Sequence, residues 1–403
     1  MEARSAKIRE WLLTEVAPQS NRCEDNQQMP DAILRRLAEL GLTGACVPAA
    51  YGGLAADSLT LGAWSALLAR ANCSLLSIFV VHAMLAQALA RFGDETQKQA
   101  LLPLLAEGRL RGAFALTEPE IGSDASAIAC SARRVAGAAS GFVLNGRKKW
   151  ISGACYADLF MVLARLENEE GTSEGVVALL VPAATPGLTV TPMRNLLGFR
   201  AAGIAELSFE HCLIPARLPF QGAPAALLGP IGGGFSFVAS HALDTGRFVV
   251  GWAGVGVMEG CLEAAAAYAR ERVQFGQALR KHQLILEMIA DMATDLAAAR
   301  ALAEKAARDR EAAGPDSILS VTMSKYFSSR ASVRVAASAL QLHGGNGCAA
   351  EFPLQRYFRD SKILEIIEGS SQMQQLMISS AALTRGRRTK SGKSAGKSDG
   401  QNA

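Results

Sequence analysis

The sequence predicts an α+β fold in three consecutive parts: an N-terminal α-helical domain, a middle β-barrel or β-sandwich domain, and a C-terminal four-helix bundle. Apolar residues recur at helical spacing up to about residue 111 and again after Phe235. Between these regions, short alternating runs are separated by turn residues. Because helices and strands are segregated along the chain, a doubly wound nucleotide-binding fold is disfavoured.

The N-terminal helical domain is expected over residues 1–112. Ile33, Leu34 and Leu37 recur at helical spacing. Asp94 lies three residues before Gln97, a spacing typical of a capping box at the start of a helix.

The β domain is expected over residues 113–220, with a turn at Asn145-Gly146. The predicted strands are residues 113–117, 127–134, 141–145, 159–165, 175–181, 188–192 and 205–210.

The helical bundle is expected over residues 221–384. Its predicted helices are residues 246–272, 283–313, 315–342 and 352–383. Gly254, Gly256 and Gly260 have nearly the spacing of a dinucleotide fingerprint, but they lie inside a predicted helix. They therefore indicate close helix packing.

Composition and charge restrict the class of protein. The chain has 403 residues, 50% of them hydrophobic, so it can bury a large core. Its eight cysteines form no CxxC pair, and we expect reduced thiols in a cytoplasmic protein. The N-terminus shows no signal-peptide pattern. The most apolar stretch, residues 75–90, is too short to span a bilayer and is expected to be a buried helix.

The positive charge is concentrated at the C-terminal end. Residues 384–403 carry six Lys or Arg and one Asp, so the rest of the chain has a net charge of −1 against a total of +4. A nearly neutral body argues against a nucleic-acid footprint. Residues 385–403 are expected to form a disordered basic tail.

No metal-binding or hydrolase motif is found. The five histidines form no HxxxH or HExxH pattern, and no GxSxG elbow is present.

Three segments carry candidate chemistry. Residues 113–124 form a strand and a loop whose N–H groups and hydroxyls can bind a polar ligand, although an ordinary turn also fits. Residues 145–153 place Trp150 and Ser152 on a strand; the alternative is a core Trp beside a solvated Lys pair. Glu368 follows two isoleucines, which should raise its pKa toward that of a general base, although a surface Glu remains the alternative.

Seven motifs, in this order, resemble the acyl-CoA dehydrogenase family over about residues 5–384. They are TEPEIGSD, LNGRKKWIS, GFRAAG followed by ELSFE, LDTGR, RERVQFGQALRKHQ, QLHGGNG and RDSKILEIIEGSSQMQ. The resemblance implies the three-part architecture, noncovalently bound FAD, an acyl-thioester substrate and a homotetramer or dimer. It gives no electron acceptor.

The resemblance also implies roles for individual residues. Residues expected to line the isoalloxazine ring are Phe114, Leu116, Thr117, Gly122, Ser123, Trp150 and Ser152. Those expected to hold the FAD of a neighbouring subunit are Arg272, Phe275, His282, Gln283, Gln341, Gly344 and Gly345, while Ser370 and Gln372 match positions near the pyrophosphate. Expected substrate contacts are Ser123, Asp244, Arg247, Ile367 and Gly369.

Glu368 matches the family's catalytic base. Some members instead carry their base at the position of Gly246, where no carboxylate is present here. Ile367 replaces a usual Tyr, and residues 201–203 are small where polar residues are common.

The chain therefore looks most like the subgroup that acts on acyl-carrier-protein thioesters when hydroxymalonyl, methoxymalonyl or aminomalonyl extender units are made for polyketides or nonribosomal peptides. A glyceryl- or seryl-type substrate is expected. The alternatives are a short- or medium-chain acyl-CoA dehydrogenase and a flavin oxidase on the same fold.

Overall fold

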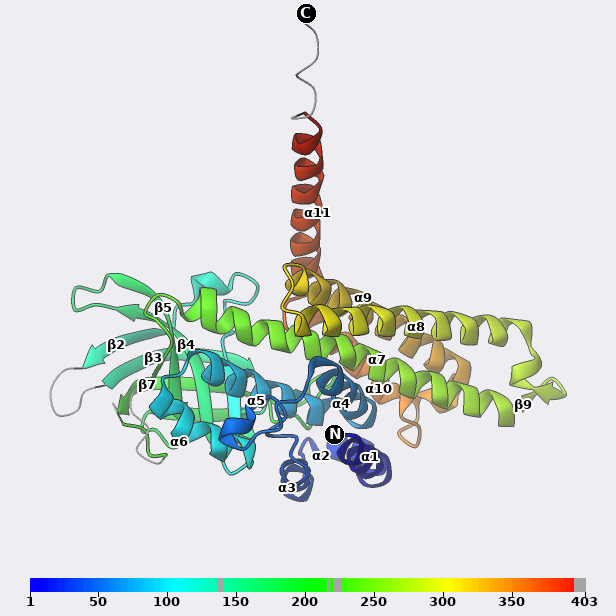
Figure 1. Cartoon of the computed structure of the whole chain (residues 1–403). Helices are drawn as coiled ribbons and strands as arrows, with labels where there is room; N and C mark the ends of the chain where they lie inside the picture. The colour runs from blue at the N-terminus through cyan, green and yellow to red at the C-terminus, as the bar shows by residue number, and fades with distance from the viewer. Residues whose placement is uncertain (136–140, 216, 221–225, 395–403) are drawn as a thin grey trace, which may run out of the picture.

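The computed structural model describes residues 1–135, 141–215, 217–220 and 226–394, with side chains up to residue 384. Within them, a helical N-terminal domain, a β domain and a long helical bundle follow one another along the chain (Figure 1). The predicted α+β fold is confirmed.

The N-terminal domain consists of short helices around one long apolar helix, α5. Its helices are α1 (Glu2–Trp11), α2 (Ser20–Asn26), α3 (Asp31–Glu39), α4 (Ser58–Ala71), α5 (Cys73–Phe92) and α6 (Glu95–Ala106). Asp94 and Gln97 form the predicted capping box at the start of α6, because each side chain accepts the other residue's backbone N–H.

The β domain forms one eight-stranded sheet. Its strands are β1 (Gly112–Ala115), β2 (Ser131–Val135), β3 (Gly141–Ile151), β4 (Leu159–Glu167), β5 (Ser173–Pro182), β6 (Leu188–Pro192), β7 (Ala205–Pro215) and β8 (Leu227–Leu228). Strand β1 pairs with the first half of β4 and β2 with its end, both in parallel. Residues 116–130 therefore leave the sheet and return to the same strand.

The predicted turn at Asn145-Gly146 is wrong, because β3 runs straight through it. The pairing of β3 with β7 shifts register between Leu144 and Gly146. Gly146 has φ +128°, and a Cβ there would lie 2.8 Å from the Cα of Cys130. Gly146 therefore forms part of a β-bulge at a point where the chain near Cys130 leaves no room for a side chain. Asn145 Oδ1 accepts the His211 N–H at 2.8 Å.

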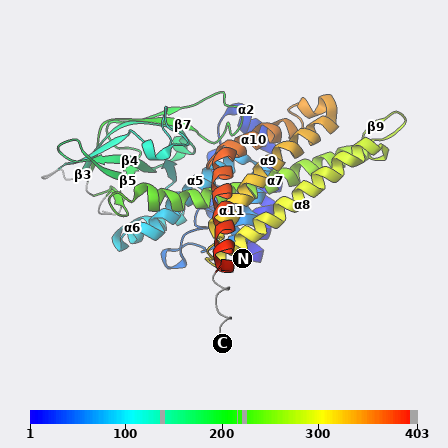
Figure 2. The same ribbon diagram turned by 90° about the horizontal axis from the view of Figure 1, so that it is seen from above.

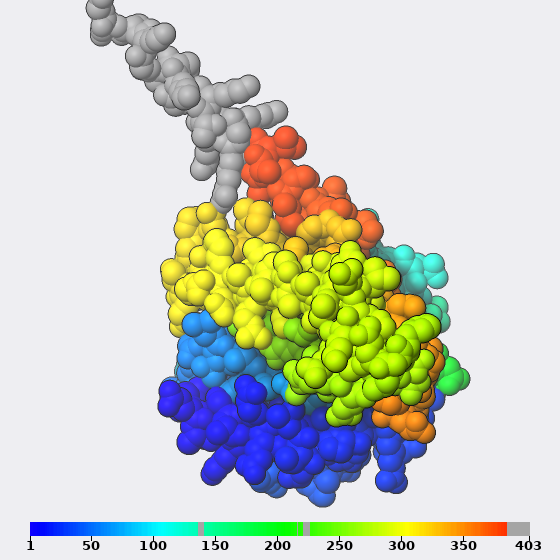
Figure 3. Space-filling view, turned by 90° about the vertical axis from the view of Figure 1, so that its right-hand side faces the viewer, coloured from blue at the N-terminus to red at the C-terminus, as the bar shows by residue number. Residues whose placement is uncertain are grey.

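The C-terminal part is built on α7 (Ser240–Glu271), which extends from the β domain to the far end of the molecule (Figures 1 and 2). A small hairpin, β9 (Val273–Gln274) and β10 (Gln277–Ala278), leads into α8 (Gln283–Glu311). Figure 3 looks onto this end. Helices α9 (Ser317–His343), α10 (Leu354–Ile366) and α11 (Ser371–Ser394) follow.

The predicted single helix over residues 352–383 is wrong, because the chain breaks between α10 and α11. Glu368 has φ +54° and Gly369 φ +86°, conformations that interrupt a right-handed helix. Helix α11 then projects from the body (Figure 1). Its backbone continues to Ser394, ten residues into the predicted disordered tail, and residues 395–403 lie outside the described part.

Three of the glycines of α7, those with nearly the spacing of a dinucleotide fingerprint, confirm the prediction of close helix packing. A Cβ on Gly256 would overlap the backbone of Ala66 in α4, one on Gly254 would lie 2.7 Å from the Ser328 carbonyl oxygen in α9, and one on Gly260 would lie 2.5 Å from the Tyr357 hydroxyl in α10. Helix α5 is longer than the predicted residues 75–90, so the expectation that it is too short to span a bilayer is wrong. Both α5 and residues 234–271 are apolar and long enough to do so, but 89% and 78% of their apolar windows are buried in this fold, and the expected burial of α5 is confirmed.

We predict that Gly256→Val destabilises the protein by about 3 kcal/mol or more, because the added side chain must displace helix backbone. Thermal denaturation measures the loss. Gly314→Ala is the control, since a Cβ there meets no atom closer than 3.9 Å. Equal melting temperatures for the two variants would contradict the packing argument.

Candidate active site

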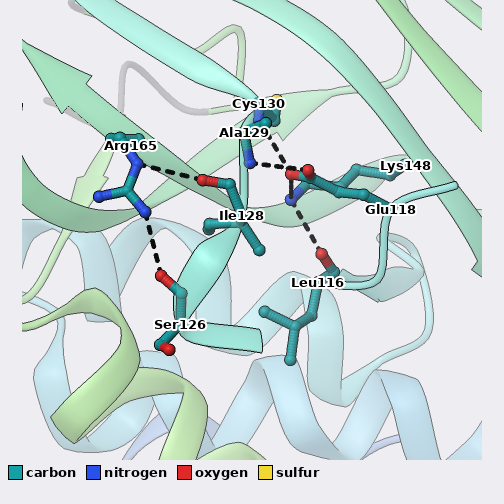
Figure 4. Close-up of polar contacts among 8 residues, drawn as sticks. All are labelled: Leu116, Glu118, Ser126, Ile128, Ala129, Cys130, Lys148 and Arg165. Carbon is teal, nitrogen blue, oxygen red and sulfur yellow. Dashed lines mark hydrogen bonds and ion pairs between the residues drawn. The ribbon is translucent and has the colours of Figure 1, made fainter. Parts of the chain in front are cut away.

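A buried ion pair closes the loop between β1 and β2 (Figure 4). The Glu118 carboxylate accepts hydrogen bonds from the N–H groups of Ala129 and Cys130, at 2.7 and 2.9 Å, and from Lys148 Nζ at 2.7 Å. Lys148 also donates to the carbonyl oxygen of Leu116 at 2.9 Å. The start and end of the loop are therefore tied to one another and to β3.

Arg165 on β4 holds the same loop from a second side. Its guanidinium donates to the carbonyl oxygens of Ile128 and Ser126, at 3.1 and 3.0 Å (Figure 4). With both ends fixed, the segment between them is presented in one position.

The alternative interpretation of residues 148–150, a core Trp beside a solvated Lys pair, is wrong for Lys148 and for Trp150. Lys148 is completely buried, whereas Trp150 is 52% exposed and has a left-handed backbone with φ +63°. Burial lowers the pKa of Lys148, although its Glu118 partner opposes this shift. The sequence carried no sign of the pairing, since thirty residues separate the two charges.

The β-domain residues expected at the flavin are brought together. The Lys149 N–H donates to the Thr117 carbonyl oxygen at 2.9 Å, so the first two candidate segments lie side by side. Phe114 and Leu116 are 8% exposed. The remaining members are half-buried or exposed, namely Thr117, Gly122, Ser123, Trp150 and Ser152.

A second group of expected flavin-binding residues lies at the end of the molecule opposite the β domain. Phe275, on the β9–β10 hairpin, is 96% exposed. The hairpin and the β domain lie at opposite ends of the molecule (Figure 1). The other residues near this end are Arg272, His282, Gln283, Gln341, Gly344 and Gly345. One chain therefore does not bring this group to Trp150.

Glu368 lies in the break between α10 and α11, with its carboxylate against α7. A side chain at Gly246 would overlap that carboxylate. Glu368 Oε2 is buried and has no hydrogen-bond partner in the described chain. A carboxylate at position 246 and one at 368 would thus occupy the same space.

Burial raises the pKa of Glu368 to about 7, while Arg247 and Lys325 oppose the rise. Lys325, on α9, is itself completely buried, and burial lowers its pKa to about 8. Its Nζ donates to the Gly369 carbonyl oxygen at 2.7 Å, which holds the left-handed turn in place. Lys325 was not predicted from the sequence, although it has helical spacing to residues such as Val321 and Ser328, which are buried on the same helix.

The remaining expected ligand-binding residues do not all lie together. Arg247, Ile367 and Gly369 lie around Glu368, and buried Arg247 Nε has no partner in the described chain. Asp244 instead forms an ion pair with Arg310. Ser370 precedes α11, Gln372 is exposed on it, and Ser123 lies on the exposed β-domain loop.

Models of the three acyl-CoA dehydrogenase domains match nearly the whole chain: the N-terminal domain at residues 2–109, the middle domain at 113–212 and the C-terminal domain at 232–383. The chain belongs to the acyl-CoA dehydrogenase family. It is therefore an FAD-dependent oxidoreductase that acts on CH–CH bonds.

Relatives and solved structures agree with this assignment. Acryloyl-CoA reductase (NADH) of Anaerotignum propionicum is 36% identical, over 94% of this chain and 93% of its own. Butyryl-CoA dehydrogenase of Megasphaera elsdenii has a TM-score of 0.87 at 30% identity, covering 95% and 97% of the two chains. FkbI, named for biosynthesis of a methoxymalonyl extender unit, has a TM-score of 0.83 at 31% identity, covering 94% and 99%.

The residues of this member of the family fit a flavin. Trp150 offers an exposed aromatic ring next to the loop fixed by Glu118. On that loop, Gly122 has no atom within 4 Å of where a Cβ would stand, so a ligand can approach the backbone closely. Glu368 offers a buried carboxylate oxygen without a partner.

We predict that Lys148→Met costs about 3–5 kcal/mol, because it leaves the Glu118 carboxylate buried without its counter-charge. The double variant Glu118→Gln/Lys148→Met should recover part of this loss. Chemical denaturation of all three proteins measures it. A Lys148→Met variant as stable as the wild type would contradict the argument.

The raised pKa of Glu368 predicts pH-dependent stability. Between its ordinary value of 4.5 and about 7, the folded protein keeps a proton that the unfolded chain loses, so stability falls as the pH rises through this window. Glu368→Gln cannot ionise, and it should therefore gain stability relative to wild type between about pH 4.5 and pH 8.

Thermal denaturation of the flavin-loaded proteins at the two pH values tests this dependence. Glu365→Gln, which removes a neighbouring carboxylate paired with Lys362, is the control. A difference between Glu368→Gln and wild type that does not change with pH would show that Glu368 has no raised pKa.

Proposed function

We propose that this enzyme dehydrogenates an acyl thioester and that Glu368 is its catalytic base. One observation carries the proposal: a buried carboxylate oxygen without a partner, held on a left-handed backbone against a glycine of α7. Its pKa of about 7 suits a group that must take up a proton near neutral pH.

Glu368 and the residues around it have different roles in the proposed proton removal. The Glu368 carboxylate takes the proton from the carbon α to the thioester carbonyl, and Gly246 leaves room for it to do so. The Glu368 N–H has no partner in the described chain and is placed to stabilise negative charge on the thioester oxygen. Lys325 holds the turn through the Gly369 carbonyl. Bound FAD supplies the acceptor for the hydride that leaves the β-carbon, and a C=C bond forms.

We propose further that the substrate is carried by an acyl carrier protein and is of glyceryl or seryl type. The likeness to FkbI supports this assignment, as do Ile367 in place of Tyr and the small residues 201–203. With a hydroxyl on the β-carbon, the product is an enol that tautomerises to an aldehyde.

An ordinary short- or medium-chain acyl-CoA dehydrogenase is the second candidate, favoured by relatives such as butyryl-CoA dehydrogenase. Anaerobic titration with glyceryl-carrier protein and with butyryl-CoA decides between them by which one bleaches the flavin. A flavin oxidase on the same fold would form peroxide rapidly in air without another acceptor.

The assembly is proposed to be a homotetramer or dimer. In one chain the hairpin group that includes Phe275 lies far from Trp150, so a second subunit is needed to bring such a group to the flavin. The eight cysteines are all free thiols, in keeping with a cytoplasmic location. No nucleic-acid or membrane partner is proposed, and the electron acceptor is left open.

We predict that Glu368→Gln retains the yellow flavin, but that thioester reduces this flavin at least about 10³-fold more slowly than in the wild type. The reason is that the amide cannot accept the α-proton. Stopped-flow absorbance under anaerobic conditions measures this rate. In the wild type, the rate should rise with pH through about 7, as the carboxylate loses its proton. Glu365→Gln is the control, and its flavin should be reduced at the wild-type rate. A wild-type rate of flavin reduction in Glu368→Gln would contradict the assignment of Glu368 as the base.

A further inference from the structure

A second polar cluster includes Asp244 and Thr245, which directly precede Gly246 on α7, and the proton-transfer chemistry does not use it. Arg310, near the end of α8, is its centre and its side chain is only 15% exposed. Arg310 Nη2 donates to Gln87 Oε1 at 3.1 Å and to Thr245 Oγ1 at 3.0 Å. Its Nε lies 3.7 Å from Asp244 Oδ2, and its guanidinium carbon lies 4.8 Å from the centre of the Phe248 ring.

This cluster adjoins the base along α7. Thr245 directly precedes Gly246, the residue that makes room for the Glu368 carboxylate. Asp244 Oδ1 and Glu368 Oε2 are both buried, and neither has a hydrogen-bond partner in the described chain. A buried polar atom without a partner needs an explanation, and a bound ligand would supply one here.

Arg310 is fixed by one terminal nitrogen and leaves the other available. No hydrogen bond of its Nη1 is found within the described residues, whereas Nη2 has two. Because the guanidinium is planar, holding Nη2 and Nε also fixes the direction of Nη1. The pair of Arg310 and Asp244 thus offers a donor and an acceptor to the same ligand.

The chemistry of this pair discriminates among acyl groups. An alkyl chain would cover a charged pair with hydrocarbon and satisfy neither group. An ammonium or a carboxylate would add a net charge beside a pair that is already neutral. A hydroxyl is uncharged and both donates and accepts, so it satisfies Asp244 and Arg310 together.

We propose that Arg310, with Asp244, is a specificity-determining site that binds a hydroxyl group of the acyl chain, so that the enzyme prefers a glyceryl-type thioester to an alkyl one. This inference rests on the proposed function and selects among its substrates. Arg310 does not touch the reacting atoms in this assignment; it positions the acyl group for Glu368.

The test compares two thioesters of N-acetylcysteamine, one carrying a 2,3-dihydroxypropanoyl group and one a butanoyl group. Anaerobic flavin reduction is followed in wild type, in Arg310→Met and in the control Arg308→Met, whose side chain is 61% exposed on the same helix. Arg310→Met should reduce about 10- to 100-fold more slowly with the dihydroxy thioester, the loss expected for one hydrogen bond to a charged group. Its rate with the butanoyl thioester should fall much less, and both rates of Arg308→Met should be unchanged.

If Arg310→Met does not retain flavin, Arg310→Lys takes its place, because it keeps the charge but loses the forked geometry and should shift the preference in the same direction. An equal loss with both thioesters would make Arg310 only a link between helices and would overturn the inference. So would a wild-type preference for the butanoyl thioester. If neither thioester bleaches the wild-type flavin, the proposed function itself fails.

Discussion

The site depends on one constraint: a carboxylate must be held inside the protein, next to a helix, without a hydrogen-bond partner of its own. Glu368 meets it by sitting in the break between α10 and α11, on a left-handed backbone that a non-glycine residue adopts at a cost of about 1–2 kcal/mol. Gly246 leaves space for the carboxylate on α7. Without the break, residue 368 would continue a helix and its carboxylate would not take this position.

The cations near Glu368 limit the rise in its pKa without forming a salt bridge with it. Arg247 and Lys325 both oppose the rise in its pKa, yet neither forms a hydrogen bond with it. Lys325 instead donates to the Gly369 carbonyl oxygen, so one buried cation both stabilises the turn and moderates the acidity of the carboxyl. A direct salt bridge would have lowered that pKa, away from the range in which a carboxylate acts as a base near neutral pH.

The buried carboxylate of the β domain differs from Glu368 because it has hydrogen-bond partners. Glu118 is completely satisfied by two backbone N–H groups and by Lys148, and so it serves to fix a loop. The two carboxylates share burial and a nearby lysine but differ in hydrogen bonding. That difference separates a structural anchor from a group free to act on a ligand.

The sequence by itself determined the three-part order of helices and strands, the capping box at Asp94 and the close packing of Gly256, because these features rest on local periodicity and small side chains. The motifs also predicted Glu368 as the catalytic base, and the structure shows that its carboxylate lies against Gly246. Only the tertiary structure decided that Asn145-Gly146 is a bulge, that Lys148 is buried with Glu118, that Lys325 holds the turn after Glu368, and that Arg310 meets Thr245. Each of these depends on contacts between residues distant in the chain, and burial and charge pairing have no local pattern from which they can be read.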